Sequence, residues 1–327
     1  MQSPPILVTG GAGFIGGVTV LKLLDAGHSV YAIDRQMPTT LLQESGAKWL
    51  TGDFSGEVSL ESIRMFRPDA IIHCAGTSLV GPSMTDPSEY YNNNVSKTIK
   101  FMDFVKDLPK KPIIMFSSSA SVYGEPDVLP LKEYDEVKPI SPYGSTKATC
   151  ELILRDYSNA YGIDTVCFRY FNAAGAEPVN FDLGQEPEAT HIVARVLEAS
   201  IAGRAFTING GDYDTEDGTC IRDYVHVWDI ARAHVLGASY MLDDYPQAGA
   251  HIYNLGTGHG TSNTEIVNYV NDQYKLPFVN YGPRRAGDPA TLVASAQRAL
   301  YHLTWEPLFS DTATIIDSAY CWYKNGV

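Results

Sequence analysis

The sequence predicts an α/β protein built around a doubly wound parallel sheet, and three observations support this fold class. Apolar runs of four to six residues alternate with longer amphipathic stretches in the first half of the chain, as in strand–helix–strand units. The runs are rich in β-branched residues, which is typical of strands buried on both faces. With 327 residues, 44% hydrophobic and 19% charged, the chain can bury one large core or two modest ones.

Six runs are predicted to be strands because each is short, apolar and bounded by turn residues. They are Ile6 to Thr9, Val30 to Asp34, Lys48 to Gly52, Ala70 to Cys74, Ile113 to Ser117 and Thr165 to Tyr170. Beyond about Asn172, helical patterns recur near Val193 to Ala202, Asp229 to Leu242 and Asn263 to Tyr274, and residues 207 to 220 read as a polar loop. We therefore expect a first domain over residues 1–172 and a smaller C-terminal α/β lobe over residues 173–327, with the chain able to cross back between them.

Composition excludes several classes of partner. The formal net charge of -14 disfavours nucleic acid and anionic membranes, because both are bound by clustered Lys and Arg. No apolar run is long enough to span a bilayer, and the start MQSPPILVTGG lacks the basic region of a secretion signal. The five cysteines are scattered, with no Cys-x-x-Cys pair, so we expect reduced thiols, no metal site and a cytoplasmic protein.

The first chemical motif is a glycine-rich turn. Gly10, Gly13 and Gly16 follow the first predicted strand and open an amphipathic helix. Glycines at these positions let the backbone turn tightly and approach a pyrophosphate, which then sits on the positive N-terminus of the helix. A glycine-rich turn without a nucleotide is the alternative. Asp34 ends the second strand, where a carboxylate accepts hydrogen bonds from an adenosine ribose and repels a 2′-phosphate. This favours NAD over NADP, although Arg35 partly offsets the repulsion.

The second motif is a Tyr-x-x-x-Lys pair, Tyr143 and Lys147. On a helix this spacing sets a phenol and an ammonium one turn apart on the same face. A nearby cation favours the ionised phenol, which can then act as a base near neutral pH. Ser141 and Pro142 precede the pair as a plausible N-cap and first helical residue.

The same spacing occurs twice more, at Tyr134/Lys138 and Tyr320/Lys324. The first of these pairs lies in an acidic loop between prolines, where no helix is expected to align it. The second lies close to a chain end that we expect to fray. We therefore expect only Tyr143 and Lys147 to be held on a stable helix.

Ser117, Ser118 and Ser119 follow the apolar part of the fifth strand. In open α/β sheets, ligands bind at this carboxyl edge. A run of small hydroxyl residues also suits a simple turn. Ser119 is therefore a candidate site residue mainly because the sequence also contains Tyr143 and Lys147.

Taken together, these motifs resemble the UDP-glucose 4-epimerases of the extended short-chain dehydrogenase/reductase superfamily, which have a Rossmann-like fold. The resemblance runs nearly end to end, and the segments that carry it are GGAGFIG, HCAGTSLVGPSMTDPSEYYNNNV, SSSASVYG, SPYGSTK, RYFNAAG, DYDTEDGTCIRDYVHV, HIYNLGTG and RRAGDPA. It implies NAD held through the catalytic cycle, a UDP-hexose substrate, inversion at sugar C4 through a 4-keto intermediate, and a homodimer.

The resemblance also implies roles for individual residues. Tyr143 takes the proton of the sugar O4, Lys147 binds the nicotinamide ribose, and Ser119 hydrogen-bonds O4. The residues implied to hold the cofactor are Gly10, Gly13, Phe14, Ile15, Gly16, Asp34, Arg35, Asp53, Phe54, Cys74, Ala75, Gly76, Asn94, Ser117, Tyr143, Lys147 and Tyr170. Those implied to hold the substrate are Ser119, Tyr143, Asn172, His191, Asn209, Arg222, Arg285, Asp288 and Leu292. Among them, Arg222 and Arg285 are implied to grip the diphosphate, although each alone could equally form a surface salt bridge.

Other activities remain open at this point. Leu292 is smaller than the Tyr of strict hexose epimerases, so UDP-N-acetylhexosamines are an alternative substrate, as are UDP-pentoses and UDP-uronic acids. A 4,6-dehydratase is disfavoured because Ser119-Ala120-Ser121 lacks the acid and base needed to eliminate water. A non-catalytic NAD-sensing protein is disfavoured by the intact Ser119, Tyr143 and Lys147.

Overall fold

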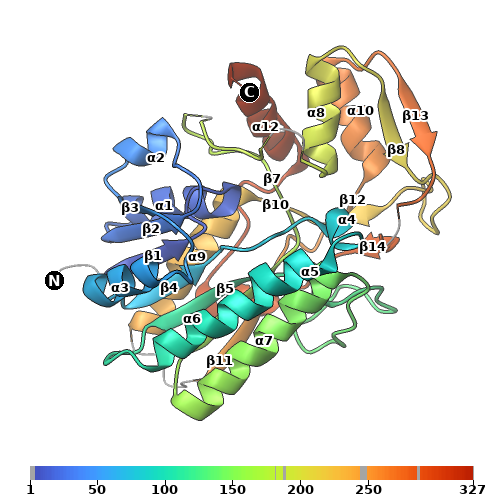
Figure 1. The fold of residues 1–327 in the computed structure, drawn as a ribbon. Coiled ribbons are helices and arrows are strands. Elements are labelled where there is room, and N and C mark those ends of the chain that lie inside the picture. Colours follow the sequence, from blue (N-terminus) through green and yellow to red (C-terminus); the bar gives the residue numbers. More distant parts are fainter. Residues whose placement is uncertain (1–3, 181, 187–188, 244–248, 286–287, 327) are drawn as a thin grey trace.

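The computed structural model describes residues 4–326 except 181, 187–188, 244–248 and 286–287. Its main feature is a parallel sheet of seven strands within the described residues, in the order β11-β6-β5-β4-β1-β2-β3 (Figure 1). The strands are β1 (Ile6–Thr9), β2 (Val30–Asp34), β3 (Lys48–Thr51), β4 (Ala70–His73), β5 (Ile113–Ser119), β6 (Thr165–Tyr170) and β11 (Ala250–Leu255). All six predicted strands are present, and the predicted fold class is confirmed.

Helices cover both faces of this sheet, as a doubly wound fold requires. The helices of the first half are α1 (Phe14–Asp25), α2 (Thr40–Glu44), α3 (Glu57–Phe66), α4 (Val80–Ser83), α5 (Pro87–Tyr90), α6 (Lys97–Lys106) and α7 (Pro142–Tyr161), with a π-helical turn over Tyr91–Ser96 and a 3₁₀ turn over Ala120–Val122. Those of the second half are α8 (Ile192–Ile201), α9 (Val227–Leu242), α10 (Asn263–Tyr274), α11 (Gln297–Leu303) and α12 (Thr312–Gly326).

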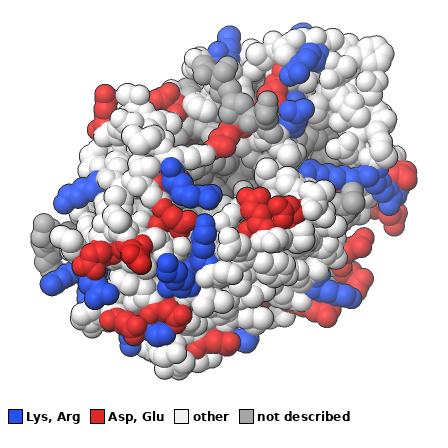
Figure 2. All heavy atoms as spheres, in the orientation of Figure 1, with Lys and Arg blue, Asp and Glu red and all other residues white. Residues whose placement is uncertain are grey.

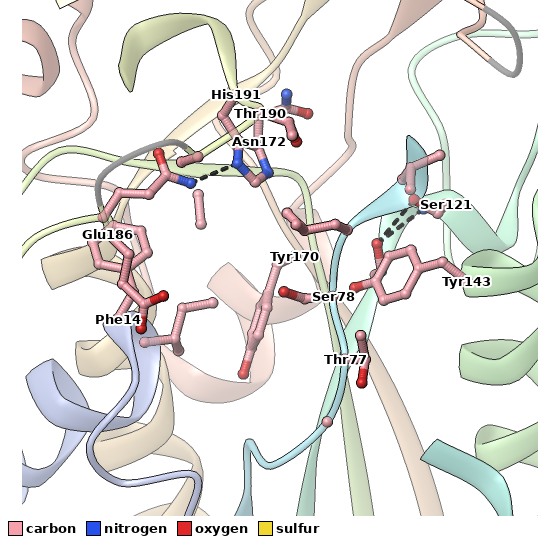
Figure 3. Close-up of a pocket in the computed structure, with 18 of the residues that line it drawn as sticks. Phe14, Thr77, Ser78, Ser121, Tyr143, Tyr170, Asn172, Glu186, Thr190 and His191 are labelled. Atoms are coloured by element: carbon pink, nitrogen blue, oxygen red, sulfur yellow. Dashed lines mark hydrogen bonds between the residues drawn. The ribbon is translucent and has the colours of Figure 1, made fainter. Parts of the chain in front are cut away.

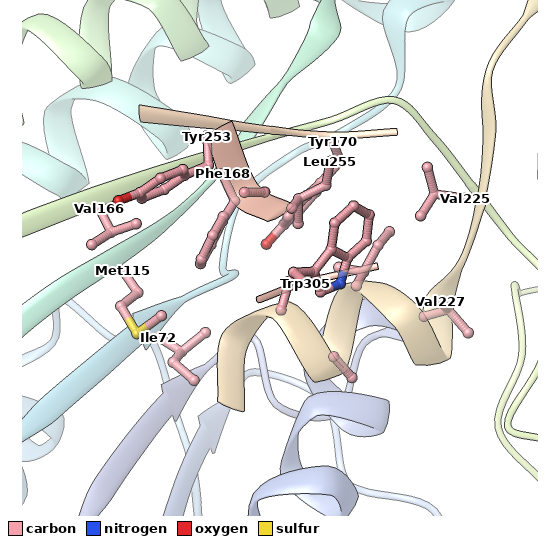
Figure 4. Packing of buried hydrophobic residues seen from close by; sticks show 14 of the residues in the cluster. Ile72, Met115, Val166, Phe168, Tyr170, Val225, Val227, Tyr253, Leu255 and Trp305 are labelled. Carbon is pink, nitrogen blue, oxygen red and sulfur yellow. The ribbon is translucent and has the colours of Figure 1, made fainter. Parts of the chain in front are cut away.

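The two faces of the sheet bury separate apolar clusters, because successive side chains of a strand point to opposite faces. Ile6 and Val8 of β1 pack into the cluster that holds α1, α9 and the buried Trp305, part of which is seen in Figure 4. Leu7, between them, packs into the cluster that holds α3, α6 and α7. The large sheet and its helices therefore include three segments from the second half of the chain, 227–242, 250–255 and 297–303.

The remaining elements form a smaller unit around a third apolar cluster, made by α8, α10 and α12. Its short sheets pair β7 (Asn172–Ala174) with β10 (Tyr224–His226), β8 (Phe206–Asn209) with β13 (Val279–Gly282), and β9 (Ile221–Arg222) with β12 (Thr261–Ser262) and β14 (Thr291–Leu292). No helix among the described residues is long and apolar enough to cross a membrane.

Three local expectations were wrong. The strand β3 is not fully buried, since Lys48 and Thr51 are exposed, because β3 is the edge strand and has one neighbour. The polar loop at 207 to 220 begins as strand β8, which runs to Asn209 and pairs with β13. The C-terminal segment does not fray before Lys324, because α12 continues to Gly326 and its apolar side is buried against α8.

Three buried histidines make stability depend on pH. His73, His226 and His234 are 0–1% exposed, and burial lowers their pKa values to about 3, 4 and 3, from an unfolded value of 6.5. Below pH 6.5 the unfolded chain therefore binds more protons than the folded one, so stability falls as the pH falls. As the pH falls below 6.5, each histidine lowers the free energy of unfolding by about 1.4 kcal/mol per pH unit, until the pH reaches its pKa in the folded protein.

We expect the urea midpoint of unfolding to be constant near pH 7.5 and to drop steeply between pH 6 and pH 5. Carboxylates do not produce this drop, because their unfolded pKa values lie near 4. An unchanged midpoint at pH 5 would contradict the neutral, buried state of the three rings.

Candidate active site

One cavity of about 1220 Å³ lies at the carboxyl edge of the large sheet and extends to the smaller unit. In Figure 2 a recess opens on the face shown, and basic and acidic side chains are intermixed around it. Apart from Asn94, every residue predicted to bind cofactor or substrate lines the cavity. Sequence motifs that lie up to 282 positions apart, from Gly10 to Leu292, are thus brought to one site.

The glycine turn after β1 leaves no room for a side chain at Gly10 or at Gly16. Gly10 has a φ of +71°, and a Cβ there would lie 2.6 Å from the backbone nitrogen of Ala75. A Cβ on Gly16 would lie 2.0 Å from the carbonyl oxygen of Gly10. Gly13 precedes the first residue of α1, so the free N–H groups of that helix face the cavity edge. This bare backbone cradle at a helix N-terminus fits a pyrophosphate.

Two carboxylates lie beside the cradle. Asp34 at the end of β2 accepts hydrogen bonds from the backbone nitrogens of Ala12 (3.0 Å) and Gln36 (2.9 Å), which fix its orientation. Burial raises the pKa of Asp53, but hydrogen bonds from Lys97 and Ser55 outweigh it and lower that pKa to about 2. Asp53 is therefore anionic at neutral pH, and the oxygens of both carboxylates can accept hydrogen bonds from a nucleoside.

Tyr143 and Lys147 project from the first two turns of α7 into the cavity. Ser141 caps this helix by accepting a hydrogen bond from the Gly144 nitrogen, and Pro142 is its first residue, so the predicted helix start is confirmed. The side chains of both Tyr143 and Lys147 are more than nine-tenths buried. The Lys147 Nζ lies 5.8 Å from the centre of the Tyr143 ring and donates a 2.7 Å hydrogen bond to the carbonyl of Ser117.

The neighbouring serine is Ser119, the last residue of β5. Its Oγ donates to Ser121 Oγ (3.2 Å) and accepts from the Ser121 nitrogen. Figure 3 shows Ser121 and Tyr143 on one side of the cavity. A hydroxyl, a phenol and an ammonium thus meet at the sheet edge, which is the set needed to move a proton on a bound alcohol.

The other two Tyr-x-x-x-Lys pairs do not reach this site. Tyr134 is 80% exposed in a loop. Tyr320 and Lys324 do lie on a stable helix, contrary to the prediction, and the Lys324 Nζ stacks 5.5 Å from the Tyr320 ring centre. Neither Tyr320 nor Lys324 lines the cavity. This pair differs from Tyr143 and Lys147 in the position of its helix in the fold, since both pairs are helical.

Buried contacts hold the floor of the cavity. Ser117 Oγ bonds to Tyr170 Oη (2.9 Å) and donates to Cys74 Sγ (3.1 Å). Burial raises the pKa of the Cys74 thiol to about 11, so it is a neutral wall residue. Asn94 lies behind the wall, where its side chain bonds to the backbone of Thr77 and to Thr146.

Two arginines, Arg222 and Arg285, line the same cavity. Arg222 on β9 donates to the carbonyl of Ile221 (2.9 Å) and lies 3.6 Å from the carboxylate of Asp288. The Arg285 guanidinium lies over Gly81, where a Cβ would be 2.5 Å from its Nη2. It has no carboxylate partner among the described residues. Arg222, which is loosely paired, and Arg285, which has no such partner, are thus suited to bind an anion.

His191 stands beside these cations at the start of α8. Gln185 Nε2 lies 2.6 Å from its Nδ1, and burial together with the charge of Arg285 lowers the pKa of His191 to about 4. The ring is therefore neutral. Asn172, Asn209 and Leu292 line the same cavity as His191, and Asn172 and His191 are both labelled in Figure 3.

Several lining residues were not predicted from the sequence. They include Thr77, Leu79, Lys97, Gln185, Glu186, Arg195, Arg204 and Tyr224. Lys97 could have been noticed only by pairing it with Asp53, 44 positions away. Gln185 and Glu186 lie in an irregular segment that has no periodic pattern, so nothing in the sequence marks them.

Comparisons with known proteins show the family of the chain. The model of the NAD dependent epimerase/dehydratase family matches residues 6–256. The UDP-glucose 4-epimerase of Halalkalibacterium halodurans is 41% identical over 98% of this chain and 96% of its own. That of Lacticaseibacillus casei is 40% identical over 98% and 97%.

Solved structures agree as well. UDP-glucose 4-epimerase from Brucella ovis in complex with NAD superposes with a TM-score of 0.90 at 38% identity, covering 98% of both chains. The enzyme from Bifidobacterium longum in complex with NAD+ and UDP gives a TM-score of 0.89 at 36% identity, again over 98% of both. With fold, cavity and sequence in agreement, the chain belongs to the NAD dependent epimerase/dehydratase family.

Proposed function

We propose that this chain is a UDP-glucose 4-epimerase, which interconverts UDP-galactose and UDP-glucose by inverting the sugar C4 through a 4-keto intermediate. The observation that carries this proposal is the meeting of three groups in one cavity: the glycine cradle, the Tyr143 and Lys147 pair, and the two arginines at the far end. Relatives that are about 40% identical over nearly the whole chain carry the same name.

The cofactor is NAD, and the cavity fits it. The cradle has no space for a Cβ at Gly10 or Gly16, and the Asp34 carboxylate lies where a ribose diol can be bound and a 2′-phosphate is repelled. When bound, NAD supplies the hydride acceptor and donor for the sugar C4. Lys147, Ser117 and Tyr170 would hold its nicotinamide end.

The protein's own part in the chemistry is the transfer of one proton. Tyr143 accepts the proton of the sugar O4 as the ketone forms and returns it when the alcohol is restored. The Lys147 Nζ lies 5.8 Å from the centre of the Tyr143 ring, where its positive charge attracts the negative charge that the phenol carries during this transfer. Ser119 Oγ is placed to hydrogen-bond O4 and keep it facing Tyr143.

Inversion requires the flat ketone to present its other face, so the sugar must turn while the rest of the substrate stays bound. Arg222 and Arg285 are suited to hold the diphosphate during this turn, because guanidinium groups bind phosphate oxygens in pairs. Asp288 beside Arg222 is placed to bind the uridine ribose. The cavity of about 1220 Å³ is large enough for a dinucleotide and a UDP-sugar together.

The breadth of accepted sugars depends on Leu292. This buried residue of β14 lies opposite Arg222 in the parallel register, and its short side chain leaves more space than a tyrosine. We propose that UDP-N-acetylgalactosamine is converted as well as UDP-galactose.

The test uses the purified protein without added cofactor. UDP-galactose, UDP-N-acetylgalactosamine and UDP-xylose are incubated separately, and each mixture is analysed for its C4 epimer. Conversion of the first two is expected. A protein that converts none of the three, even after NAD is added, is not an epimerase, and one that binds NAD but stays inactive is a binding protein.

Replacing Gly16 with alanine tests the cradle. The new Cβ would lie 2.0 Å from the Gly10 carbonyl oxygen, a backbone atom that cannot move without distorting the turn. We expect purified Gly16→Ala to carry at least about ten-fold less NAD than the parent protein, because a displaced turn loses its hydrogen bonds to the pyrophosphate. Gly46→Ala is the control for backbone strain alone: Gly46 has a φ of +95°, which alanine also strains, but nothing lies within 4 Å of its Cβ and it does not line the described cavity. Equal NAD content in Gly16→Ala would place the cofactor elsewhere.

We also propose that the protein is a cytoplasmic homodimer. The five cysteines are free thiols in the structure, which is typical of a reducing compartment. Ile99 on α6 and Leu152 on α7 are 38% and 50% exposed, and these two helices pack together at the outer surface, where a second copy could cover them. Sedimentation equilibrium is expected to give twice the 35.8 kDa chain mass, and a single-chain mass would contradict the dimer.

A further inference from the structure

The 183–186 segment connects the two halves of the cavity. Gln185 and Glu186 line it, and Figure 3 shows Glu186 and Phe14 on the side of the cavity away from Tyr143 and Ser121. Phe14 is the first residue of α1, at the proposed pyrophosphate site. The segment is thus positioned to affect the cofactor and the substrate together.

At its first residue the segment rests on α1. Leu183 is 4% exposed and belongs to the apolar cluster under that helix. Its Cδ2 lies 3.4 Å from where a Cβ of Gly17 would be, and its carbonyl accepts a 2.7 Å hydrogen bond from the Glu177 nitrogen. Leu183 therefore fixes the segment against the helix that forms the cofactor cradle.

In its middle the segment is held by the C-terminal helix. The carbonyl oxygen of Gln185 accepts hydrogen bonds from Trp322 Nε1 and Tyr323 Oη, both at 3.0 Å. A Cβ on Gly184 would lie 2.3 Å from Trp322 Cδ1, so backbone and indole are in close contact. Both lone pairs of one carbonyl are used, which fixes the Gln185 backbone to α12.

The Gln185 side chain connects the segment to His191, which is proposed to bind the substrate. Its Nε2 lies 2.6 Å from His191 Nδ1. An amide nitrogen can only donate, so Nδ1 accepts, and the neutral ring carries its proton on Nε2. This leaves His191 with one N–H donor for a ligand, beside the cation of Arg285.

We infer that the 183–186 segment is a positioning wall shared by the two nucleotide sites, and that Trp322 and Tyr323 control both NAD retention and UDP affinity through it. This inference rests on the proposed function. Neither aromatic residue lines the described cavity, so they act through Leu183 and Gln185. The segment does not carry Tyr143, Lys147 or Ser119, and the chemical step is therefore left unchanged.

The test compares the double variant Trp322→Phe/Tyr323→Phe with Tyr320→Phe. Tyr320 lies on the same helix, where its ring stacks on Tyr274 at 3.7 Å between centroids, away from the segment. Two quantities are measured without turnover: the rate at which bound NAD is lost into NAD-free buffer, and the Kd of UDP by calorimetry in excess NAD.

In the double variant we expect NAD loss to be about ten-fold faster and the Kd of UDP to rise about ten-fold, since the Gln185 carbonyl loses both of the side-chain donors that hold it. The kcat in saturating NAD and UDP-galactose is expected to stay within about two-fold. Tyr320→Phe is expected to match the parent protein in all three. If the double variant fails to fold, Tyr323→Phe alone, which keeps the ring, is expected to change both quantities in the same direction.

Two further variants separate the ends of the segment. Leu183→Ala is expected to speed NAD loss and leave the Kd of UDP unchanged, while Gln185→Leu is expected to weaken UDP binding and leave NAD loss unchanged. A double variant that behaves like Tyr320→Phe overturns the inference, and so does equal response of both quantities to either single variant. Absence of UDP-galactose conversion by the parent protein overturns the proposed function instead, and leaves both binding measurements interpretable.

Discussion

Replacing Tyr143 with phenylalanine is expected to lower kcat by between about 10²- and 10⁴-fold, the range for loss of a positioned acid–base group. The phenol is the one side chain of the site that we assign to carry the sugar O4 proton. Its ring is buried and forms a T-shaped pair with the ring of Tyr90, and phenylalanine keeps that packing. NAD content and the unfolding midpoint are therefore expected to match the parent protein.

Tyr134→Phe is the matched control, because Tyr134 has the same spacing to a lysine but is 80% exposed in a loop. Its kcat is expected to be unchanged. If Tyr143→Phe retained more than about a tenth of the parent kcat, the proton would have to be carried by another group, and the proposed mechanism would be wrong.

Replacing Arg169 with methionine is expected to destabilise the fold by about 3–5 kcal/mol, the cost of leaving one charge of a buried pair without its partner. Arg169 on β6 is 2% exposed and makes two hydrogen bonds to Glu151, at 3.0 Å and 2.7 Å. Glu151 lies one turn beyond Lys147 on α7 and also accepts from Ser118. The pair thus ties the proposed catalytic helix to the sheet.

Urea unfolding at pH 7 measures this loss. In the double variant Glu151→Leu/Arg169→Met, the buried charge is removed together with its partner, and most of the lost stability is expected to return. A single variant within about 1 kcal/mol of the parent would mean that water reaches Glu151, contrary to its 8% exposure.

The fold was predictable where a segment's own pattern decided its structure. The run from Ile6 to Thr9 is apolar up to Val8 and is buried on both faces. Ser141 and Pro142 marked the start of α7 correctly, because capping is local chemistry. The run from Ala250 to Leu255 was missed as a strand, since its pairing with β6 is a tertiary contact with a segment 85 positions earlier.

The same distinction applies to the site. The glycine turn and the Tyr143 and Lys147 pair are short motifs, and their placement in one cavity follows from the parallel sheet, whose strands end at one edge. The contacts of Gln185 with α12 join residues 137 positions apart, and no local pattern encodes them. Lys324 was expected to lie on a frayed end, because burial of α12 against α8 is likewise invisible in the segment's own sequence.

The proposed mechanism requires the hydrogen on C4 to leave the sugar and to return to it within one closed site. Incubating the protein with UDP-galactose deuterated at C4 in ordinary water tests this most directly. UDP-glucose that keeps the deuterium at C4 is the predicted result. Product that carries protium from water at C4 would mean proton exchange instead of hydride return, and would contradict the account.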